Sequence, residues 1–296
     1  MKITELFKQK QAVVSFEIFP PKQVSSIDVI FETIDGLVPL RPDYISVTYG
    51  AGGSSTKTTV EIAAKIKNKY GLNSLAHLTC IGSSKSQMDE ILNELKDNDI
   101  SNILVLRGDF PRDANPADLP NDFKQASDLA QYIASKFDFC LGGACYPEIH
   151  PECSSLDKDI ENLKRKVDAG VSFLVTQLFF NNDQFYRFRN KAAQQNINVP
   201  IQAGIMPITN RKSIEKMLSL TNSEMPLKLT RILDKFEHNQ EAIKDVGIAY
   251  ATEQIIDLLS QDVNGVHIFT MNKPQITKDI LRNLGSLIYS INKQTI

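Results

Sequence analysis

Eight apolar runs of strand length recur along the chain, and segments with helical periodicity separate them. We expect strands at residues 12–19, 43–49, 73–80, 102–108, 140–146, 173–180, 201–207 and 265–271. We expect helices at about 25–38, 57–69, 85–98, 124–136, 156–169, 182–195 and 210–220, with a closing helix at 275–290. Such alternation is typical of a parallel sheet, because each pair of parallel strands needs a long crossover connection.

A chain of 296 residues with eight strand-helix units matches a (β/α)8 barrel. A doubly wound open sheet is the alternative. The regular spacing is broken by the Pro-, Asp- and Asn-rich stretch 110–122, expected to be a mobile loop over the active face. It is broken again at 222–260, where extra helical segments separate the seventh helix from the eighth strand. We therefore predict one α/β domain over residues 1–296, a single (β/α)8 TIM barrel with these extra helical segments.

The composition indicates an ordinary globular protein and excludes several kinds of partner. It is 42% hydrophobic and 23% charged, with a formal net charge of -2. Because Lys and Arg are nearly balanced by acids and form no long basic block, no nucleic-acid partner is expected. The start, residues 1–8, lacks the apolar core of a signal peptide, and no run approaches about 18 apolar residues. A cytoplasmic protein without membrane association is expected.

The cysteines are too few and too irregularly spaced for a disulfide framework in a chain of this length, so reduced thiols are expected. They are Cys80, Cys140, Cys145 and Cys153. Two His-x-x-Cys pairs occur, the first formed by His77 and Cys80, and could be read as zinc ligands. However, His77 and Cys80 would lie on opposite faces of a strand, so one ion could not easily bind both. No metal site is expected.

Glu17 is an acid inside the apolar stretch 12–19, which two prolines end. Because side chains alternate across a strand, Phe16 and Ile18 share one face while Glu17 points the other way, near the C-terminal end. An ionised carboxylate there is costly unless it is paired, solvated or protonated. Desolvation favours the protonated form, which suits a general acid. The alternative is a structural carboxylate that caps a neighbouring loop.

Polar side chains also occur at the ends of other predicted strands, where barrel enzymes collect their catalytic groups. They are Thr48, Tyr49, His77, Arg107, Asp109, Tyr146 and Gln177. Each alone could be a satisfied core residue. Together they would destabilise the core, because so many buried polar groups could not all find hydrogen-bond partners. The set therefore predicts a polar site at the mouth of the barrel.

Two further segments have features of phosphate or nucleotide binding. Residues 50–55 follow a strand and open a helix, but they lack a full Gly-x-Gly-x-x-Gly and the Lys of a Walker loop, so a tight turn is favoured. In the fifth helix, Asp159, Asn162 and Lys166 share one side. They form either a solvated face or, with His150 in the preceding loop, a site for the ribose and diphosphate of a long cofactor.

On its motifs the chain resembles the methylenetetrahydrofolate reductases of bacterial type. The resemblance covers nearly the whole chain, and its motifs are FEIFPP at 16–21, VTYGA at 47–51, HLTC at 77–80, LRGD at 106–109, YPEIHPE at 146–152, NLKRKVDAG at 162–170 and TQ at 176–177. That family is a flavoprotein (β/α)8 barrel. The resemblance implies that FAD carries a hydride from NADH or NADPH to methylenetetrahydrofolate, giving methyltetrahydrofolate for methionine synthesis.

The resemblance also implies roles for individual residues. Glu17 would be the general acid, and Asp109, near the flavin and the pterin, would be the second catalytic residue. FAD contacts are implied for Thr48, Tyr49, Ala51, His77, Arg107, Gly108, Asp109, Ala126, Tyr146, His150, Asp159, Asn162, Arg165 and Lys166. Substrate contacts are implied for Glu17, Thr48, Asp109, Gln177, Ser213, Met217 and Lys273.

Four positions depart from the family pattern. Gln125 stands where some relatives have a Tyr against the flavin, and Met217 where some have a Phe on the folate or nicotinamide ring. Ser213 and Lys273 occupy positions that resemble those of the family's Gln and Arg for folate. Since Met can still pack on a ring, these departures concern substrate stacking and not the reaction.

Two substrates that exchange only a hydride can take turns at one flavin face, which predicts ping-pong kinetics. One alternative is a non-flavin barrel lyase or aldolase, but a Schiff-base enzyme needs a lysine at a strand end and no predicted strand has one. The other is a folate- or flavin-binding barrel without reductase turnover. The expected partners are folate and a nicotinamide nucleotide, and the expected assembly is a homo-oligomer. Because the chain ends soon after the barrel closes, no regulatory domain is expected.

Overall fold

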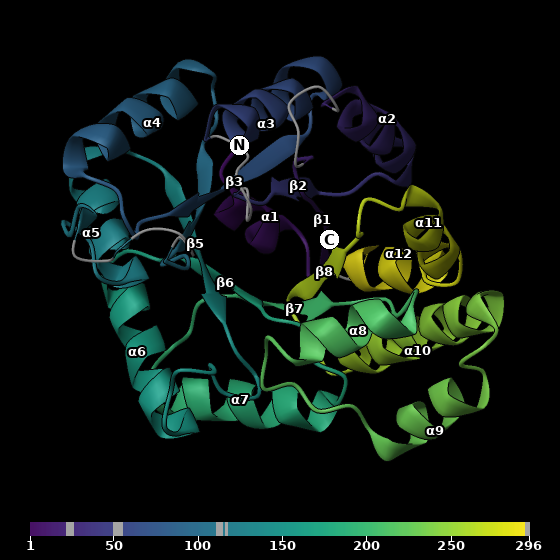
Figure 1. The fold of residues 1–296 in the computed structure, drawn as a ribbon. Helices are drawn as coiled ribbons and strands as arrows, with labels where there is room; N and C mark the ends of the chain where they lie inside the picture. Colours follow the sequence, from purple (N-terminus) through teal and green to yellow (C-terminus); the bar gives the residue numbers. More distant parts are fainter. Residues whose placement is uncertain (22–26, 50–55, 111–114, 116–117, 294–296) are drawn as a thin grey trace.

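Eight parallel strands close into one barrel, and helices surround it (Figure 1). The computed structural model describes residues 1–21, 27–49, 56–110, 115 and 118–293. The strands are β1 Val13–Ile18, β2 Tyr44–Val47, β3 Asn73–Thr79, β4 Asn102–Leu106, β5 Cys140–Cys145, β6 Phe173–Thr176, β7 Ile201–Ile205 and β8 Gly265–Phe269. Because β1 pairs in parallel with both β2 and β8, the barrel is confirmed and the open sheet is excluded.

Each strand lies within its predicted segment but ends before that segment does. The residues left over at the C-terminal ends include the polar side chains that the sequence pattern places at the mouth, such as Thr48, Arg107 and Gln177. The apolar runs therefore continue past the sheet into the loops that form the mouth.

The predicted helices are also present. They are α2 Ile27–Leu37, α3 Thr56–Tyr70, α4 Lys85–Asp97, α5 Ala126–Lys136, α6 Leu156–Asp168, α7 Asn182–Gln194 and α8 Arg211–Leu218. A short 3-10 helix, η2 Val38–Leu40, follows α2. Ser84 caps α4 in a capping box with Gln87, and Ser155 caps α6 by accepting the Lys158 N–H at 3.2 Å.

The extra helical segments between the seventh helix and the eighth strand are confirmed. They are α9 Leu227–Lys235 and α10 Gln240–Ser260. The predicted single closing helix is wrong, since α11 Pro274–Arg282 and α12 Gly285–Lys293 replace it. The break falls at Asn283 and Leu284. Leu284 is fully buried, and Gly285, which begins α12, is a poor helix former.

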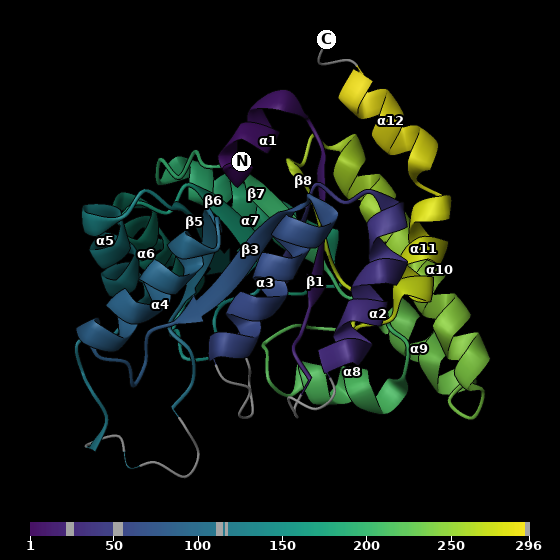
Figure 2. The same ribbon diagram turned by 90° about the horizontal axis from the view of Figure 1, so that it is seen from above.

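A short helix that the sequence analysis does not predict, α1 Ile3–Gln9, closes the N-terminal end of the barrel. Its buried Ile3 and Leu6 join a cluster made by inward-facing residues near the starts of the strands, including Val13, Leu75 and Phe173. Figure 2 shows α1 at the end of the barrel opposite α8. The other end, where the strands finish, is left for the mouth.

The two faces of each strand serve different purposes. Phe16 and Ile18 point outward into the main apolar cluster shared with the helices, whereas Ser15 and Glu17 point into the barrel, as the alternation of side chains predicts.

In the described part of the chain, no helix is long and apolar enough to cross a membrane. The predicted loop at 110–122 and the turn at 50–55 lie partly or wholly outside the described residues.

Candidate functional site

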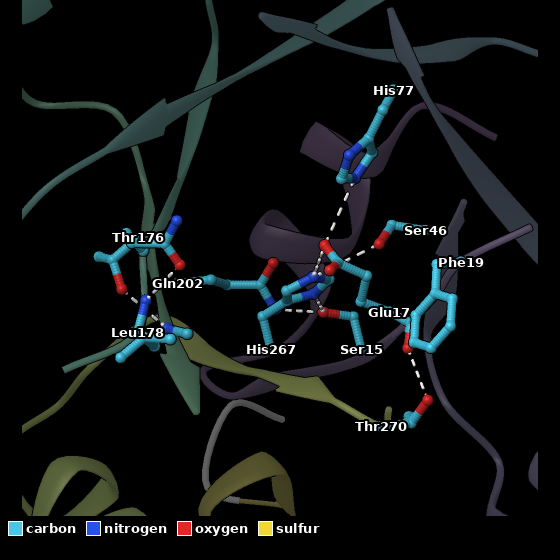
Figure 3. A network of polar contacts seen from close by, with 12 residues as sticks. Ser15, Glu17, Phe19, Ser46, His77, Thr176, Leu178, Gln202, His267 and Thr270 are labelled. Carbon is cyan, nitrogen blue, oxygen red and sulfur yellow. Dashed lines mark hydrogen bonds and ion pairs between the residues drawn. The ribbon is translucent and has the colours of Figure 1, made fainter. Parts of the chain in front are cut away.

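Glu17 ends in a carboxylate that lies between two imidazoles (Figure 3). Its Oε2 is 3.6 Å from Nε2 of His77 on β3 and 3.5 Å from Nε2 of His267 on β8. The Glu17 side chain is 19% exposed, while those of His77 and His267 are 6% and 1% exposed. The carboxylate is therefore the accessible member of the group, and the two imidazoles lie beneath it.

His77 is held as a neutral imidazole. The pKa of His77 is lowered to about 4. Burial is the main cause and His267 adds to it, while the nearby Glu17 carboxylate partly opposes the shift. Its Nε2 is buried and makes no hydrogen bond within the described ranges, since 3.6 Å to Glu17 is too long for one. His77 thus carries a buried polar atom that the described residues leave without a hydrogen bond.

The orientation of His267 follows from a chain of hydrogen bonds through the barrel interior. The buried Tyr44 hydroxyl donates to Oε1 of Gln202, so the Gln202 amide nitrogen faces Ser15 and donates to its Oγ at 3.1 Å. The Ser15 hydroxyl is 2.7 Å from Nδ1 of His267. Nε2 of His267, on the other side of the ring, lies 3.5 Å from Oε2 of Glu17 and 3.4 Å from Oγ of Ser46.

The sequence pattern does not single out this interior layer. Its members are Ser15, Tyr44, Ser46, Gln202 and His267. A signal was present, because His267 is flanked by Val266 and Ile268 in a predicted strand, the same arrangement that identifies Glu17. The sequence alone does not show that β1 pairs with β8, and this pairing sets Ser15 opposite His267.

Arg107 and Glu152 form a second charged group beyond β4 and β5. Nη2 of Arg107 donates to Oε1 of Glu152 at 2.7 Å, Nη1 donates to Oε2, and Nε donates to the Gly108 carbonyl at 3.2 Å. The pair raises the pKa of Arg107 and lowers that of Glu152. Gly108 has φ +81, and a Cβ there would lie 2.8 Å from Cβ of Thr79, so only glycine fits. Asp109 follows on the exposed rim.

The loop after β5 packs onto α6. The rings of Tyr146 and His150 meet edge to face with centroids 4.6 Å apart. The His150 N–H donates to Oδ2 of Asp159 at 2.8 Å, and the Asn162 amide lies 3.7 Å from Sγ of Cys153. Burial raises the pKa of Tyr146 to about 12 and lowers that of His150. Asp159 and Asn162 thus face the exit of β5 rather than solvent.

Lys166, one turn further along α6, faces the same exit. Its Nζ donates to the Ala144 carbonyl at 2.7 Å, and no carboxylate of the described residues forms an ion pair with it. Burial lowers the pKa of Lys166, while Cys145 and Asp159 oppose the shift. A buried ammonium group with a single carbonyl partner has two N–H donors to offer an anion. The neighbouring Arg165 is exposed.

The remaining predicted contacts are spread around the mouth. The Thr48 N–H donates to the Ile18 carbonyl at 3.0 Å, and the Gln177 N–H donates to the Cys145 carbonyl at 2.8 Å. Tyr49 follows Thr48 and packs against the main apolar cluster. Ala126 begins α5 directly after its N-cap Gln125, and Ala51 lies outside the described residues.

The predicted substrate contacts Ser213 and Met217 both lie on α8. Met217 is half-buried against the apolar cluster that contains Leu178 and Phe180. Lys273 follows β8, and its Nζ donates to Oγ1 of Thr209 at 3.1 Å. The strand order places these residues beside Glu17 and places the Arg107 and Lys166 groups across the mouth from it.

The chain matches the family model described as methylenetetrahydrofolate reductase over residues 2–285. It belongs to that family. The 5,10-methylenetetrahydrofolate reductase of Escherichia coli (strain K12) is 35% identical over 277 residues, which cover 94% of this chain and 92% of that protein. Methylenetetrahydrofolate reductase (NADH) 1 of Arabidopsis thaliana is 37% identical over 296 residues, which cover 96% of this chain and 50% of that protein. The chain therefore spans about half the length of the plant relatives.

The fold also has a solved counterpart. An uncharacterized protein from Clostridium thermocellum, described as binding two copies of 5-methyl-5,6,7,8-tetrahydrofolic acid, superposes with a TM-score of 0.70. The match covers 98% of this chain and 99% of that one at 14% sequence identity, so it shows a shared fold.

We expect acid to destabilise the protein through His77. Because its folded pKa of about 4 lies below the ordinary 6.5, the unfolded chain takes up the proton first, and stability falls as the pH drops through this window. Between about pH 8 and about pH 5 the loss through His77 should be about 2 kcal/mol. Urea unfolding at the two pH values measures it, and His77→Gln should lose about 2 kcal/mol less than wild type.

His238→Gln is the matched control, because its ring is 94% exposed. It should follow the wild-type pH dependence. If His77→Gln and His238→Gln lose equal stability on acidification, the neutral buried state of His77 is wrong.

Proposed function

We propose that this chain is a methylenetetrahydrofolate reductase, which passes a hydride from NADH or NADPH through FAD to 5,10-methylenetetrahydrofolate and forms 5-methyltetrahydrofolate. The observation that carries the proposal is the Glu17 carboxyl, which is accessible at the barrel mouth and lies 3.5 Å from Nε2 of the buried His267. Family membership and the names of the bacterial relatives support the same reaction.

The residues on the far side of the mouth fit a cofactor with a diphosphate. Lys166 is a buried cation that lacks an anionic partner among the described residues, and an anion would complete its hydrogen bonds. Gly108 keeps the rim clear of a side chain beside Arg107. When bound, FAD would supply the redox chemistry, in which a hydride is taken from the nicotinamide and passed to the folate. Asp159 and His150 lie at the exit of β5, where a ribose of the cofactor would be held.

The chain's own residues supply orientation and a proton. Glu17 would protonate a ring nitrogen of methylenetetrahydrofolate and so open its five-membered ring to an electrophilic iminium. His267, with Nε2 3.5 Å from Oε2 of Glu17, would hold the carboxyl in place. Asp109, on the exposed rim, would bind the amino groups of the pterin through charge-assisted hydrogen bonds. Gln177, Ser213, Met217 and Lys273 would contact the folate or nicotinamide.

Loss of the Lys166 charge should weaken FAD binding. Removing a charged hydrogen-bond donor from a buried anion costs roughly 10- to 100-fold in affinity. We expect Lys166→Ala to raise the FAD dissociation constant by that factor in a fluorescence titration of the apoprotein. Lys164→Ala is the matched control, because Lys164 lies on the same helix and pairs with Asp168 at the surface. Failure of the wild-type chain to bind any FAD would overturn the assignment of the cofactor.

The reaction should follow ping-pong kinetics, because one barrel mouth must admit both substrates in turn. Initial rates measured over a grid of nicotinamide and folate concentrations should give parallel double-reciprocal lines. Intersecting lines would indicate that both substrates bind together, which contradicts a shared position at the mouth.

Glu17→Gln should separate the two half-reactions. Hydride transfer from NADH needs alignment only, whereas folate reduction also needs a proton, and a positioned acid contributes roughly 10²- to 10⁴-fold to such a step. We expect near-normal flavin content and nicotinamide oxidation, with folate reduction lowered by about that factor. Stopped-flow absorbance of the flavin measures each step. Equal loss in both steps, or in neither, would show that Glu17 is a structural carboxylate.

A further inference from the structure

The turn after β8 is tied to the end of β1 by side-chain hydrogen bonds. Oγ1 of Thr270 donates to the Glu17 carbonyl at 2.6 Å (Figure 3). The amide of Asn272 accepts the Phe19 N–H at 3.1 Å and donates to the Phe19 carbonyl at 2.9 Å. The register of β1 with β8 ends at the pair Glu17 and Phe269, so Asn272 continues the ladder with its side chain beyond the last paired strand residues.

The end of β1 is thus fixed on both sides. On the side of β8, Thr270 and Asn272 form hydrogen bonds with the carbonyl of Glu17 and with both backbone groups of Phe19. On the side of β2, the Thr48 N–H donates to the carbonyl of Ile18 at 3.0 Å. Residues 17–19, which set the direction of the Glu17 side chain, are therefore hydrogen-bonded on both sides.

The turn that provides this clamp has an uncommon backbone. Met271 and Asn272 have φ values of +51° and +54°, in the left-handed region. Asn tolerates this region, but Met has no side-chain group that compensates for the steric strain there. Such conformations persist where the surroundings fix them, and they cluster at functional sites. Here the Asn272 N–H donates to Oγ1 of Thr270 at 3.1 Å and closes the turn.

Phe19 adds a second reason to assign the clamp to the reaction. Its ring is 39% exposed and lies beside Glu17 (Figure 3). It is held at the mouth by backbone hydrogen bonds and not by burial in the core. An exposed aromatic ring beside a candidate acid suits contact with a flat heteroaromatic substrate. The next residue after Asn272 is Lys273, so the same turn also carries an expected folate contact.

We propose that Asn272 is a positioning residue, which holds the end of β1 so that the Glu17 carboxyl reaches the substrate nitrogen. This inference rests on the proposed function. It assigns to the turn after β8 a role in folate reduction and none in the hydride transfer from the nicotinamide, because only folate reduction uses the acid.

Asn272→Gly tests the proposal. Glycine keeps the left-handed backbone without strain and removes only the amide, so the turn should still form. Because a misplacement of about 1 Å can cost about 10²-fold, we expect folate reduction to fall about 10- to 100-fold in stopped flow. Nicotinamide oxidation and the FAD dissociation constant should stay within about twofold of wild type. The substitution removes no charge, and it lies across the mouth from Lys166, where the diphosphate is expected.

Two further variants sharpen the result. Asn196→Gly is the matched control, because Asn196 also has a positive φ, +57°, but lies in the turn after α7 at the opposite end of the barrel. It should keep both half-reactions. Asn272→Asp keeps the acceptor for the Phe19 N–H and removes the donor to the Phe19 carbonyl, so it should fall between Asn272→Gly and wild type. Asp also tolerates the left-handed region, so this variant serves if the glycine variant proves unstable.

A double-variant cycle decides whether Asn272 acts through Glu17. If it does, adding Asn272→Gly to Glu17→Gln should lower the residual folate reduction by less than about twofold, because the two changes remove the same proton delivery. Full additivity, equal loss in both half-reactions, or no loss in Asn272→Gly would each overturn the inference while wild-type turnover stands. A wild-type enzyme that oxidises the nicotinamide but never reduces methylenetetrahydrofolate would overturn the proposed function and the inference with it.

Discussion

Closure of the barrel between β1 and β8 is the constraint on which the site depends. These strands are about as far apart in the sequence as two elements of the barrel can be, yet their register places Ser15 beside His267 and Glu17 beside Phe269. Closure is possible because Gly265 adopts φ +147°, and a Cβ there would lie only 2.0 Å from the Val13 carbonyl. Without this glycine, neither the imidazole contact to Glu17 nor the turn that clamps Phe19 would form.

The interior of the barrel shows how a polar layer can be buried without a large penalty. Tyr44, Gln202, Ser15 and His267 form one hydrogen-bonded chain, which ends at His267 beside the accessible carboxyl. A fully satisfied network of this kind fixes rotamers, whereas a partly satisfied one would destabilise the core. The geometry of Glu17 is therefore set by residues on three other strands, although none of them reaches the mouth.

Local patterns were enough to predict the barrel and the inward direction of Glu17. Both follow from rules of short range, namely the alternation of side chains along β1 and the recurrence of apolar runs. The seven-residue helix α1 gave too short a pattern, and its role depends on contacts with Phe173 and other distant residues. His267 was missed for a similar reason, since its importance comes from a neighbour about 250 residues away. The ion pair of Arg107 with Glu152 likewise depends on how two loops fold together.

The neutral state of His77 has a consequence for the acid beside it. A charged imidazolium 3.6 Å from Glu17 would be a buried cation in direct contact with the candidate acid. Burial prevents this, because it lowers the pKa of His77 to about 4 and so removes the charge at neutral pH. The cost appears elsewhere, as a loss of stability in acid. The cations of the mouth, Arg107 and Lys166, lie instead on the side of β4 and β5, where they can meet an anion away from Glu17.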